Sequence, residues 1–111
     1  MENIYTVEEI KALVTPVAER YGVDDVYLFG SYARGEATGE SDIDLRITRG
    51  GMDISNWKFG GFLVALDEAL QKDVDVVTTE SLYQDANDKN TKRLLKRISG
   101  EEILLYDRKR A

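Results

Sequence analysis

Residues 30–45 read GSYARGEATGESDIDL, and the rest of the chain is best understood from this stretch. A β-branched and aromatic run, residues 26–29, ends at Gly30 and predicts a strand that enters a sharp turn. A second strand is predicted over residues 43–48, because apolar and charged residues alternate there. One face of this second strand is therefore expected to be core and the other face charged.

Two aspartates open the second predicted strand. The period of two in a strand places Asp42 and Asp44 on one face, close enough for both carboxylates to reach a single cation. Two like charges side by side raise a pKa and lower stability, so the pair indicates a compensating hard cation such as Mg²⁺. Gly30 lets the backbone turn closely around a ligand, and the Ser31 hydroxyl and neighbouring amides can donate to phosphate oxygens.

A third acid follows on another predicted strand, residues 74–78, where Asp75 lies between two valines. If this strand lies beside the second with the same face exposed, Asp75 joins Asp42 and Asp44. Three carboxylates, Mg²⁺ and a nucleoside triphosphate form the set that in-line nucleotidyl transfer needs: two carboxylates hold metal and phosphates, and the third helps to ionise the acceptor hydroxyl. Asp73 has the same parity, but it is expected at a turn, so we prefer Asp75.

Histidine and cysteine are both absent from the sequence. Their absence excludes disulfides, thiolate nucleophiles, zinc sites built on these ligands, iron–sulfur clusters and Ser-His-Asp triads. Carboxylates around a hard divalent cation remain the most capable chemistry. The formal net charge of −6, from 15 Lys and Arg against 21 Asp and Glu, argues against nonspecific nucleic-acid binding by the whole surface, although a local basic stripe could still bind phosphates.

The length predicts a single domain over residues 1–111, because a chain of this size supports one core and little more. No apolar run approaches the roughly 18 residues needed to span a bilayer. The first residues show neither the basic nor the hydrophobic region of a signal peptide. We therefore expect a cytoplasmic protein with no membrane association.

A first helix is predicted over residues 7–21. Thr6 and Glu9 form a capping-box pattern, and Gly22 is a natural stop. Pro16 removes one hydrogen bond and clashes with the preceding turn, so a kink or a break is expected just before it.

Two further helices are expected, over residues 85–99 with a stop at Gly100, and between the second and third strands. A short final strand or extended tail is expected over residues 103–106. Candidate caps of the helix between the strands are Asp53, Ser55 and Asn56, and its apolar side is expected to hold Trp57, Phe62, Leu63, Leu66 and Leu70. We interpret the aromatic residues Trp57, Phe59 and Phe62 as core anchors rather than as a platform for base stacking.

The sequences VYLFGSYARGEATGESDIDL, residues 26–45, and KDVDVVT, residues 72–78, carry a resemblance to a known family. The chain closely resembles the DNA polymerase β-like nucleotidyltransferase superfamily, in particular the minimal, MNT-type nucleotidyltransferases of prokaryotes. The resemblance covers most of the chain and implies an α/β (α+β) domain of polymerase β-like fold. It implies a short mixed sheet of about three or four strands, with helices packed mainly on one face and the carboxylates near the other.

The resemblance also implies residue roles and a reaction. Gly30 and Ser31 become the triphosphate-binding turn, Asp42 and Asp44 the metal ligands, and Asp75 the third acid. The implied reaction is transfer of a nucleoside monophosphate, in the first place AMP from ATP, with one or two Mg²⁺ ions and release of pyrophosphate.

The resemblance suggests two classes of acceptor. One is a protein hydroxyl, as in MNT antitoxins of toxin–antitoxin pairs that adenylylate a tyrosine of a HEPN-type toxin. The other is a small-molecule hydroxyl, as in antibiotic nucleotidyltransferases, which usually carry a second domain for the acceptor. Since no second domain is expected here, we favour a protein acceptor. A catalytically silent module that neutralises its partner by binding, and a homo-oligomeric state, stay open.

Two arginines leave alternatives open. Arg34 is either a triphosphate contact or a surface arginine in a turn. Arg46 lies on the carboxylate face where relatives usually carry an apolar residue, and it could pair with Asp44 or with a phosphate. Arg46 also excludes an EF-hand, because its position in such a loop needs an oxygen ligand. A P-loop is excluded because Glu36, rather than lysine, follows the second glycine.

A basic set on the late helix has two interpretations. Such charge runs are usually solvated faces, and the functional alternative is docking to an acidic partner or acceptor. The set consists of Lys89, Lys92, Arg93, Lys96 and Arg97.

Overall fold

The computed structural model describes residues 4–50 and 56–110. The elements follow in the order α1 (Val7–Tyr21), β1 (Asp25–Phe29), α2 (Ser31–Arg34), β2 (Ile43–Thr48), α3 (Asn56–Leu70), β3 (Val74–Thr78), α4 (Thr79–Gln84), α5 (Lys89–Glu101), β4 (Ile103–Asp107) and a 3₁₀ turn, Arg108–Arg110. None of the helices in these described ranges is long and apolar enough to cross a membrane.

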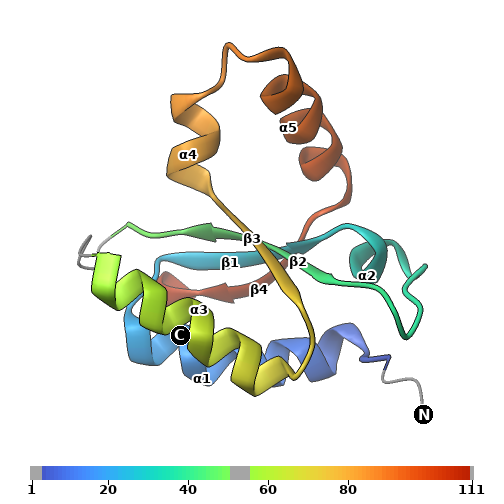
Figure 1. Cartoon of the computed structure of the whole chain (residues 1–111), viewed down its shortest axis with the longest axis vertical. Coiled ribbons are helices and arrows are strands. Elements are labelled where there is room, and N and C mark those ends of the chain that lie inside the picture. Colours follow the sequence, from blue (N-terminus) through green and yellow to red (C-terminus); the bar gives the residue numbers. More distant parts are fainter. Residues whose placement is uncertain (1–3, 51–55, 111) are drawn as a thin grey trace.

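Within the described residues, the strands form one mixed sheet of four strands in the order β3-β2-β1-β4. β1 runs antiparallel to both β2 and β4, whereas β2 and β3 are parallel. Helices α1 and α3 cover one face of this sheet, and α4 and α5 rise from the other face (Figure 1). The expected mixed α/β architecture is thus confirmed, with the addition of a helical hairpin on the second face.

Helix α1 has the predicted bounds and the predicted capping box. The Thr6 hydroxyl accepts the Glu9 amide at 3.1 Å, the Glu9 carboxylate accepts the Thr6 amide at 2.9 Å, and Gly22 ends the helix with φ of 74°. Of the kink or break expected before Pro16, the break is wrong, because α1 continues through this residue, and the kink stays a prediction. Pro16 lies on the exposed side, while the buried side, with Ile10, Val14 and Ala18, packs continuously against the sheet.

Helix α3 begins at Asn56. The candidate caps Asp53 and Ser55, and the side chain of Asn56, lie outside the described part of the structure. Phe62, Leu66 and Leu70 are fully buried in the main core, as predicted.

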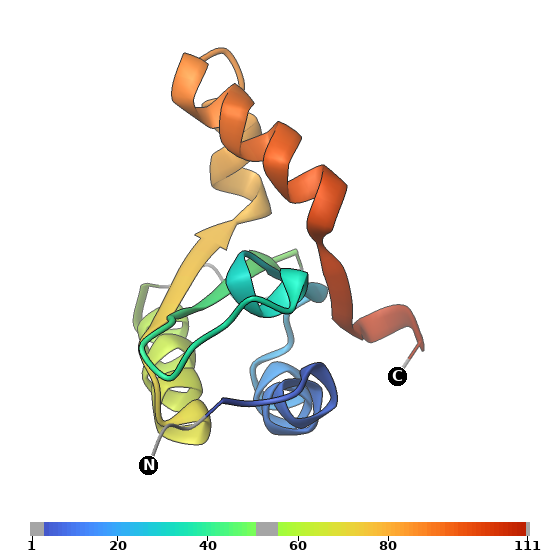
Figure 2. The same cartoon turned by 90° about the vertical axis from the view of Figure 1, so that its right-hand side faces the viewer.

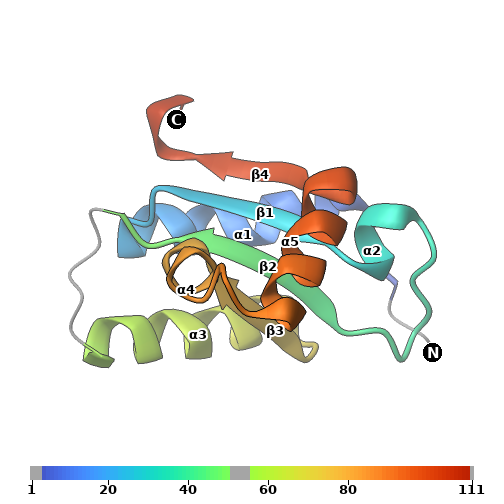
Figure 3. The ribbon, with the colours of Figure 1, turned by 90° about the horizontal axis from the view of Figure 1, so that it is seen from above.

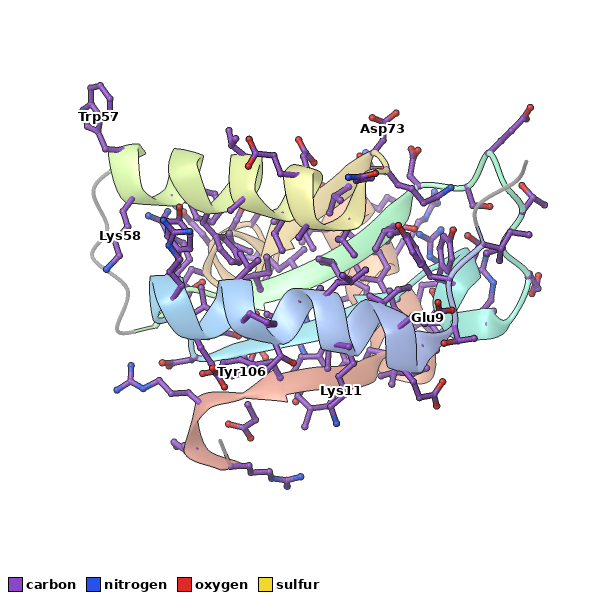
Figure 4. All side chains as sticks on the ribbon, turned by 90° about the horizontal axis from the view of Figure 1, so that it is seen from below. Glu9, Lys11, Trp57, Lys58, Asp73 and Tyr106 are labelled. Carbon is purple, nitrogen blue, oxygen red and sulfur yellow. The ribbon has the colours of Figure 1, made fainter. Side chains whose placement is uncertain are left out.

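The expectation that Trp57 anchors the core is wrong, because its side chain is 91% exposed and points away from the molecule (Figure 4). The helical period explains the error. Residues 57 and 64 fall on one stripe of α3, and residues 59, 62 and 66 fall on the opposite stripe, which faces the sheet.

Residues 79–101 form a hairpin of two helices, α4 and α5, that projects from the sheet (Figure 2). The helix predicted over residues 85–99 corresponds to α5, which begins four residues later and ends two residues later, whereas α4 was not predicted. The Thr78 hydroxyl accepts the Ser81 amide at 3.2 Å and begins α4 directly after β3, and the Asp88 carboxylate accepts two amides at 3.1 Å and begins α5. Gly100 lies inside α5 rather than ending it.

A small second core joins the hairpin to the sheet. Phe29 of β1, Leu82 of α4 and Ile98 of α5 are buried together, with Val77 of β3 packed against them. This hydrophobic contact fixes α4 and α5 over the face that Figure 3 shows from the hairpin side.

A polar clamp adds to this attachment. The guanidinium of Arg46 on β2 donates to the Glu102 carboxylate at 2.9 and 3.0 Å and to the Thr79 hydroxyl at 2.7 Å, and it lies 4.3 Å from the centre of the Tyr27 ring. Of the two alternatives left open for Arg46, pairing with Asp44 is not observed, and a phosphate contact is not tested. Arg46 instead ties the sheet to both ends of the hairpin.

We expect Arg46→Met to lower the free energy of unfolding by about 1–3 kcal/mol, because it leaves the Glu102 carboxylate without its charged partner in a half-buried place. Urea denaturation followed by circular dichroism measures this loss. Arg110→Met is the matched control, since Arg110 pairs with Asp107 while 78% exposed and should change stability by less than about 0.5 kcal/mol. Equal losses in the two variants would contradict a structural role for the clamp.

Candidate active site

The sheet brings two of the predicted acids into register. Asp44 on β2 is the direct partner of Asp75 on the parallel strand β3, as the sequence parity predicts. Asp42 precedes β2 by one residue, and Asp73 precedes β3. Asp42 and Asp75 are exposed, whereas Asp44 is half-buried. The three acids therefore lie along one end of two neighbouring strands, on the face that carries the hairpin.

Gly30 lies beside this end of the two strands, which we call the acidic edge and which carries Asp42, Asp44 and Asp75. It follows Phe29, which pairs with Asp44 across β1 and β2. Gly30 has φ of 77°, and a Cβ atom at this position would collide with the Asp44 carboxylate. The carboxylate of Asp44 thus lies directly against the backbone of the Gly-Ser turn.

The short helix α2 begins at Ser31 and ends at Gly35, whose φ of 75° turns the chain back towards β2. A helix of four residues is too short to show a periodic pattern, so α2 was not predicted. Its effect is to place Arg34 one turn above Gly30, with the Arg34 amide donating to the Gly30 carbonyl at 3.1 Å.

The electrostatics of the site centre on Asp44. Burial raises the pKa of its carboxyl, and the charges of Asp75 and Asp42 raise it further, while Arg97 and Arg34 act in the opposite direction. The charges of the other two acids therefore act unfavourably on the Asp44 carboxylate, which is the situation that a bound cation relieves.

No group of three His, Cys, Asp or Glu side chains within residues 4–50 and 56–110 is arranged so that it could hold a metal ion. The chemistry of the donors fits a hard cation, since carboxylate oxygens are the ligands that Mg²⁺ prefers. The structure places Asp44 and Asp75 in register but does not gather the three carboxylates into one metal-binding group. The assignment of Asp42, Asp44 and Asp75 as metal ligands stays a prediction.

Glu101, at the end of α5, is a site residue that the sequence did not reveal. Its carboxylate accepts the Gly30 amide at 3.1 Å and two hydrogen bonds from Arg34, at 3.0 and 3.2 Å. Burial tends to raise the pKa of Glu101, but the bonds from Arg34 and Gly30 outweigh it and lower the pKa. Glu101 and Gly30 are 71 positions apart, so no local pattern could have found the pair.

Arg34 is accordingly bound within the protein rather than being an isolated surface residue. Its Nε also donates to Glu36 at 3.2 Å, and its side chain remains 38% exposed. The guanidinium therefore borders the Gly-Ser turn and is open to solvent, an arrangement that allows it to contact a bound anion.

The basic set of α5 forms a solvated face, as the usual interpretation of such runs predicts. Each of its members is exposed, and Arg97 Nε lies 3.8 Å from Glu101 Oε1. Docking of a partner on this face stays a prediction.

The structure is an α/β domain with a mixed sheet and an acidic strand end packed against a Gly-Ser turn, and the fold alone does not assign a function to it. The particular family follows from the comparison with known proteins. Residues 10–100 match the family model described as the nucleotidyltransferase domain, and the chain belongs to this family of nucleotidyltransferases.

Three individual proteins illustrate the relationship. A candidate protein adenylyltransferase of Methanocaldococcus jannaschii is 36% identical over 81 residues, covering 69% of this chain and 82% of that protein. The structure of a candidate minimal nucleotidyltransferase superposes with a TM-score of 0.63 at 27% identity, covering 89% of this chain and 95% of that chain.

A third match shares the fold at lower identity. It comes from the complex of a tri-AMPylated Shewanella oneidensis HEPN toxin with an MNT antitoxin, with a TM-score of 0.61 and 18% identity, covering 95% of this chain and 76% of that chain.

We expect Asp44→Asn to raise the melting temperature of the protein by a few degrees at neutral pH in EDTA. Because the fold raises the pKa of Asp44, its ionised form lowers stability above that pKa, and this loss fades as the pH falls through it. The gain should therefore vanish at about pH 3, where the carboxyl is protonated in folded and unfolded chains alike.

Differential scanning fluorimetry across pH measures this effect. The exposed Asp73 supplies the matched control, and Asp73→Asn should leave the melting temperature unchanged. A lower melting temperature for Asp44→Asn at neutral pH would show that the Asp44 carboxylate makes net favourable contacts.

Proposed function

We propose that this single domain transfers AMP from ATP to a hydroxyl group of a partner protein of the HEPN toxin type, in a reaction that needs Mg²⁺. The observation that carries the proposal is the register of Asp44 with Asp75, beside a Gly-Ser turn against which the Asp44 carboxylate packs. The family supports nucleotidyl transfer, and relatives named as protein adenylyltransferases support AMP as the group and protein as the acceptor. The HEPN–MNT complex supports the kind of partner.

Asp42, Asp44 and Asp75 would hold the metal in this proposal. When bound, Mg²⁺ would neutralise phosphate charge and orient the α-phosphate for in-line attack. Asp44 is suited to be the central ligand, since the charges of both other acids act on it and its carboxylate is fixed against Gly30.

The triphosphate would be bound by the turn. The Gly30 amide, the Ser31 hydroxyl and the Arg34 guanidinium are donors on one short segment, residues 30–34. Arg34 can donate two parallel hydrogen bonds to phosphate oxygens. Of its two interpretations, we therefore favour a triphosphate contact over a surface arginine in a turn.

The transfer step forms one bond and breaks another. The acceptor oxygen attacks the α-phosphorus of ATP, the bond from that phosphorus to the oxygen bridging towards the β-phosphorus breaks, and pyrophosphate leaves. Asp75 would receive the proton of the acceptor hydroxyl, because its carboxylate is exposed and reachable from outside the protein while facing the same edge as Asp44.

The openness of this edge favours a protein acceptor. Both Asp42 and Asp75 are exposed, so the acceptor has to supply much of its own positioning surface. A folded protein can provide such a surface, whereas a small sugar or aminoalcohol needs an enclosing pocket.

We expect substitutions of the three acids to have different effects on ATP binding and on the rate of transfer. Asp42→Asn and Asp44→Asn should abolish Mg²⁺-dependent ATP binding, whereas Asp75→Asn should slow transfer by about 10²–10⁴-fold and weaken ATP binding far less. Isothermal titration of ATP with and without Mg²⁺, together with single-turnover transfer, measures both quantities.

Asp73→Asn is the matched control for Asp75→Asn and should leave both binding and rate close to those of the unmodified protein. Equal affinity for ATP with and without Mg²⁺ would contradict the metal site. Mg²⁺-dependent binding without any transfer would favour a module that neutralises its partner by binding alone.

We also expect radiolabelled ATP and a lysate of the native host to yield one labelled protein band that mass spectrometry identifies as HEPN-type. Changing Lys92, Arg93 and Lys96 on α5 together to Glu should slow this labelling about tenfold at low salt, because α5 presents the exposed basic face beside the site. The difference should shrink as salt screens the charges.

The control for this variant changes three exposed basic residues away from the hairpin, Lys11, Arg20 and Lys109, together to Glu. It has the same charge change and should label its partner at the normal rate. Labelled sugars or aminoalcohols without a labelled protein would instead place the protein with the small-molecule nucleotidyltransferases.

A further inference from the structure

The Glu101 carboxylate accepts hydrogen bonds from the Gly30 amide and the Arg34 guanidinium, the donors that the proposed function assigns to phosphate. Its Oε1 accepts the Gly30 amide at 3.1 Å, and its two oxygens accept Arg34 Nη1 at 3.2 and 3.0 Å. The Glu101 side chain is only 14% exposed, although Arg34 and Arg97 around it are 38% and 60% exposed. A shielded carboxylate thus lies on the donors of the turn, with basic side chains on its open side.

We propose that Glu101 determines the affinity of the nucleotide site as an internal competitor: its carboxylate holds Gly30 and Arg34 in the nucleotide-free protein, and the triphosphate of ATP displaces it. This inference rests on the proposed function of the Gly-Ser turn. It adds a residue 71 positions away from Gly30 to the determinants of nucleotide binding.

Competition follows from the chemistry of the two anions. Carboxylate and phosphate oxygens accept the same charge-assisted hydrogen bonds, and the Gly30 amide has one hydrogen to donate. A triphosphate placed beside an ionised Glu101 would also meet a like charge in a place shielded from water. Glu101 and the phosphates therefore exclude one another from this turn.

Glu101 can leave without unfolding the hairpin. The next residue, Glu102, is held by Arg46, and Ile98 one turn earlier is buried in the second core. Arg97, at 3.8 Å, offers the released carboxylate another partner on its exposed side. A change of the Glu101 side chain therefore suffices, and α5 keeps its place on the sheet.

The test measures binding of ATP and of inorganic tripolyphosphate, each with Mg²⁺, by isothermal titration. Glu101→Gln keeps the size of the side chain and removes its charge, and Glu101→Ala removes the competing oxygens as well. Both variants should bind ATP roughly tenfold more tightly, as expected when a conformer that blocks the site about 90% of the time is lost. Tripolyphosphate should gain as much as ATP, because the competition concerns phosphate groups alone.

Two matched controls remove a carboxylate close by. Glu36→Gln has the same charge change and also loses a partner of Arg34, but Glu36 does not touch the Gly30 amide. Glu102→Gln changes the neighbouring residue, which contacts Arg46. Neither should raise the affinity for ATP by more than about twofold. The NMR resonance of the Gly30 amide gives a second readout. Glu101→Ala should shift this resonance strongly, and ATP should shift it in both the variant and the unmodified protein.

The outcomes separate this inference from the proposed function. Unchanged or weaker ATP binding in Glu101→Gln and Glu101→Ala, with normal Mg²⁺-dependent binding in the unmodified protein, overturns the inference and leaves the proposed function standing. An equal gain in Glu36→Gln also overturns it, since the loss of any carboxylate beside Arg34, without contact to the Gly30 amide, would then explain the effect. If Arg34→Ala leaves tripolyphosphate binding unchanged, the phosphate site itself is wrong, and the inference falls with it.

Discussion

The contact between the Asp44 carboxylate and the backbone at Gly30 is the constraint on which the site depends. It requires a glycine, because φ is 77° and a Cβ atom would strike the carboxylate. It also requires the antiparallel register that places Phe29 opposite Asp44. One strand pairing thus sets the distance between the acidic edge and the Gly-Ser turn. The parallel pairing of β2 with β3 then adds Asp75 beside Asp44 without any further device.

The hairpin is part of this site rather than a lid on the sheet. Phe29, the residue that precedes Gly30, is buried by Leu82 and Ile98, so the turn and the hairpin share one small core. Two neighbouring acids at the end of α5 then bind different parts of the sheet region: Glu101 accepts a hydrogen bond from the Gly30 amide, just after β1, and Glu102 accepts one from the Arg46 guanidinium on β2. Because the two acids have different partners, the Glu101 contact with Gly30 can be exchanged while the Glu102 contact with Arg46 holds the hairpin in place.

Local patterns were sufficient for α1, β2 and β3, since capping at Thr6 and the alternation of apolar and charged residues need no distant partner. They also placed Asp75 on the correct face. They missed α4, a helix of six residues whose buried side chain, Leu82, packs against Phe29 and Ile98 from distant parts of the chain. The partners of Arg46 and Gly30 lie 56 and 71 positions away, and such pairs become visible only in the fold.

Charge connects the three parts of the site. Arg97 on α5 acts against the raised pKa of Asp44 and lies near Glu101, so a single exposed side chain faces both the acidic edge and the turn. Because Arg97 is 60% exposed, solvent screens it, and its effect on either carboxylate is modest when the site is open. An acceptor protein that covers α5 would exclude that solvent and strengthen every interaction beneath it. Under the proposed function, an acceptor docked on α5 would therefore cover Arg97 beside both the acidic edge and the Gly-Ser turn.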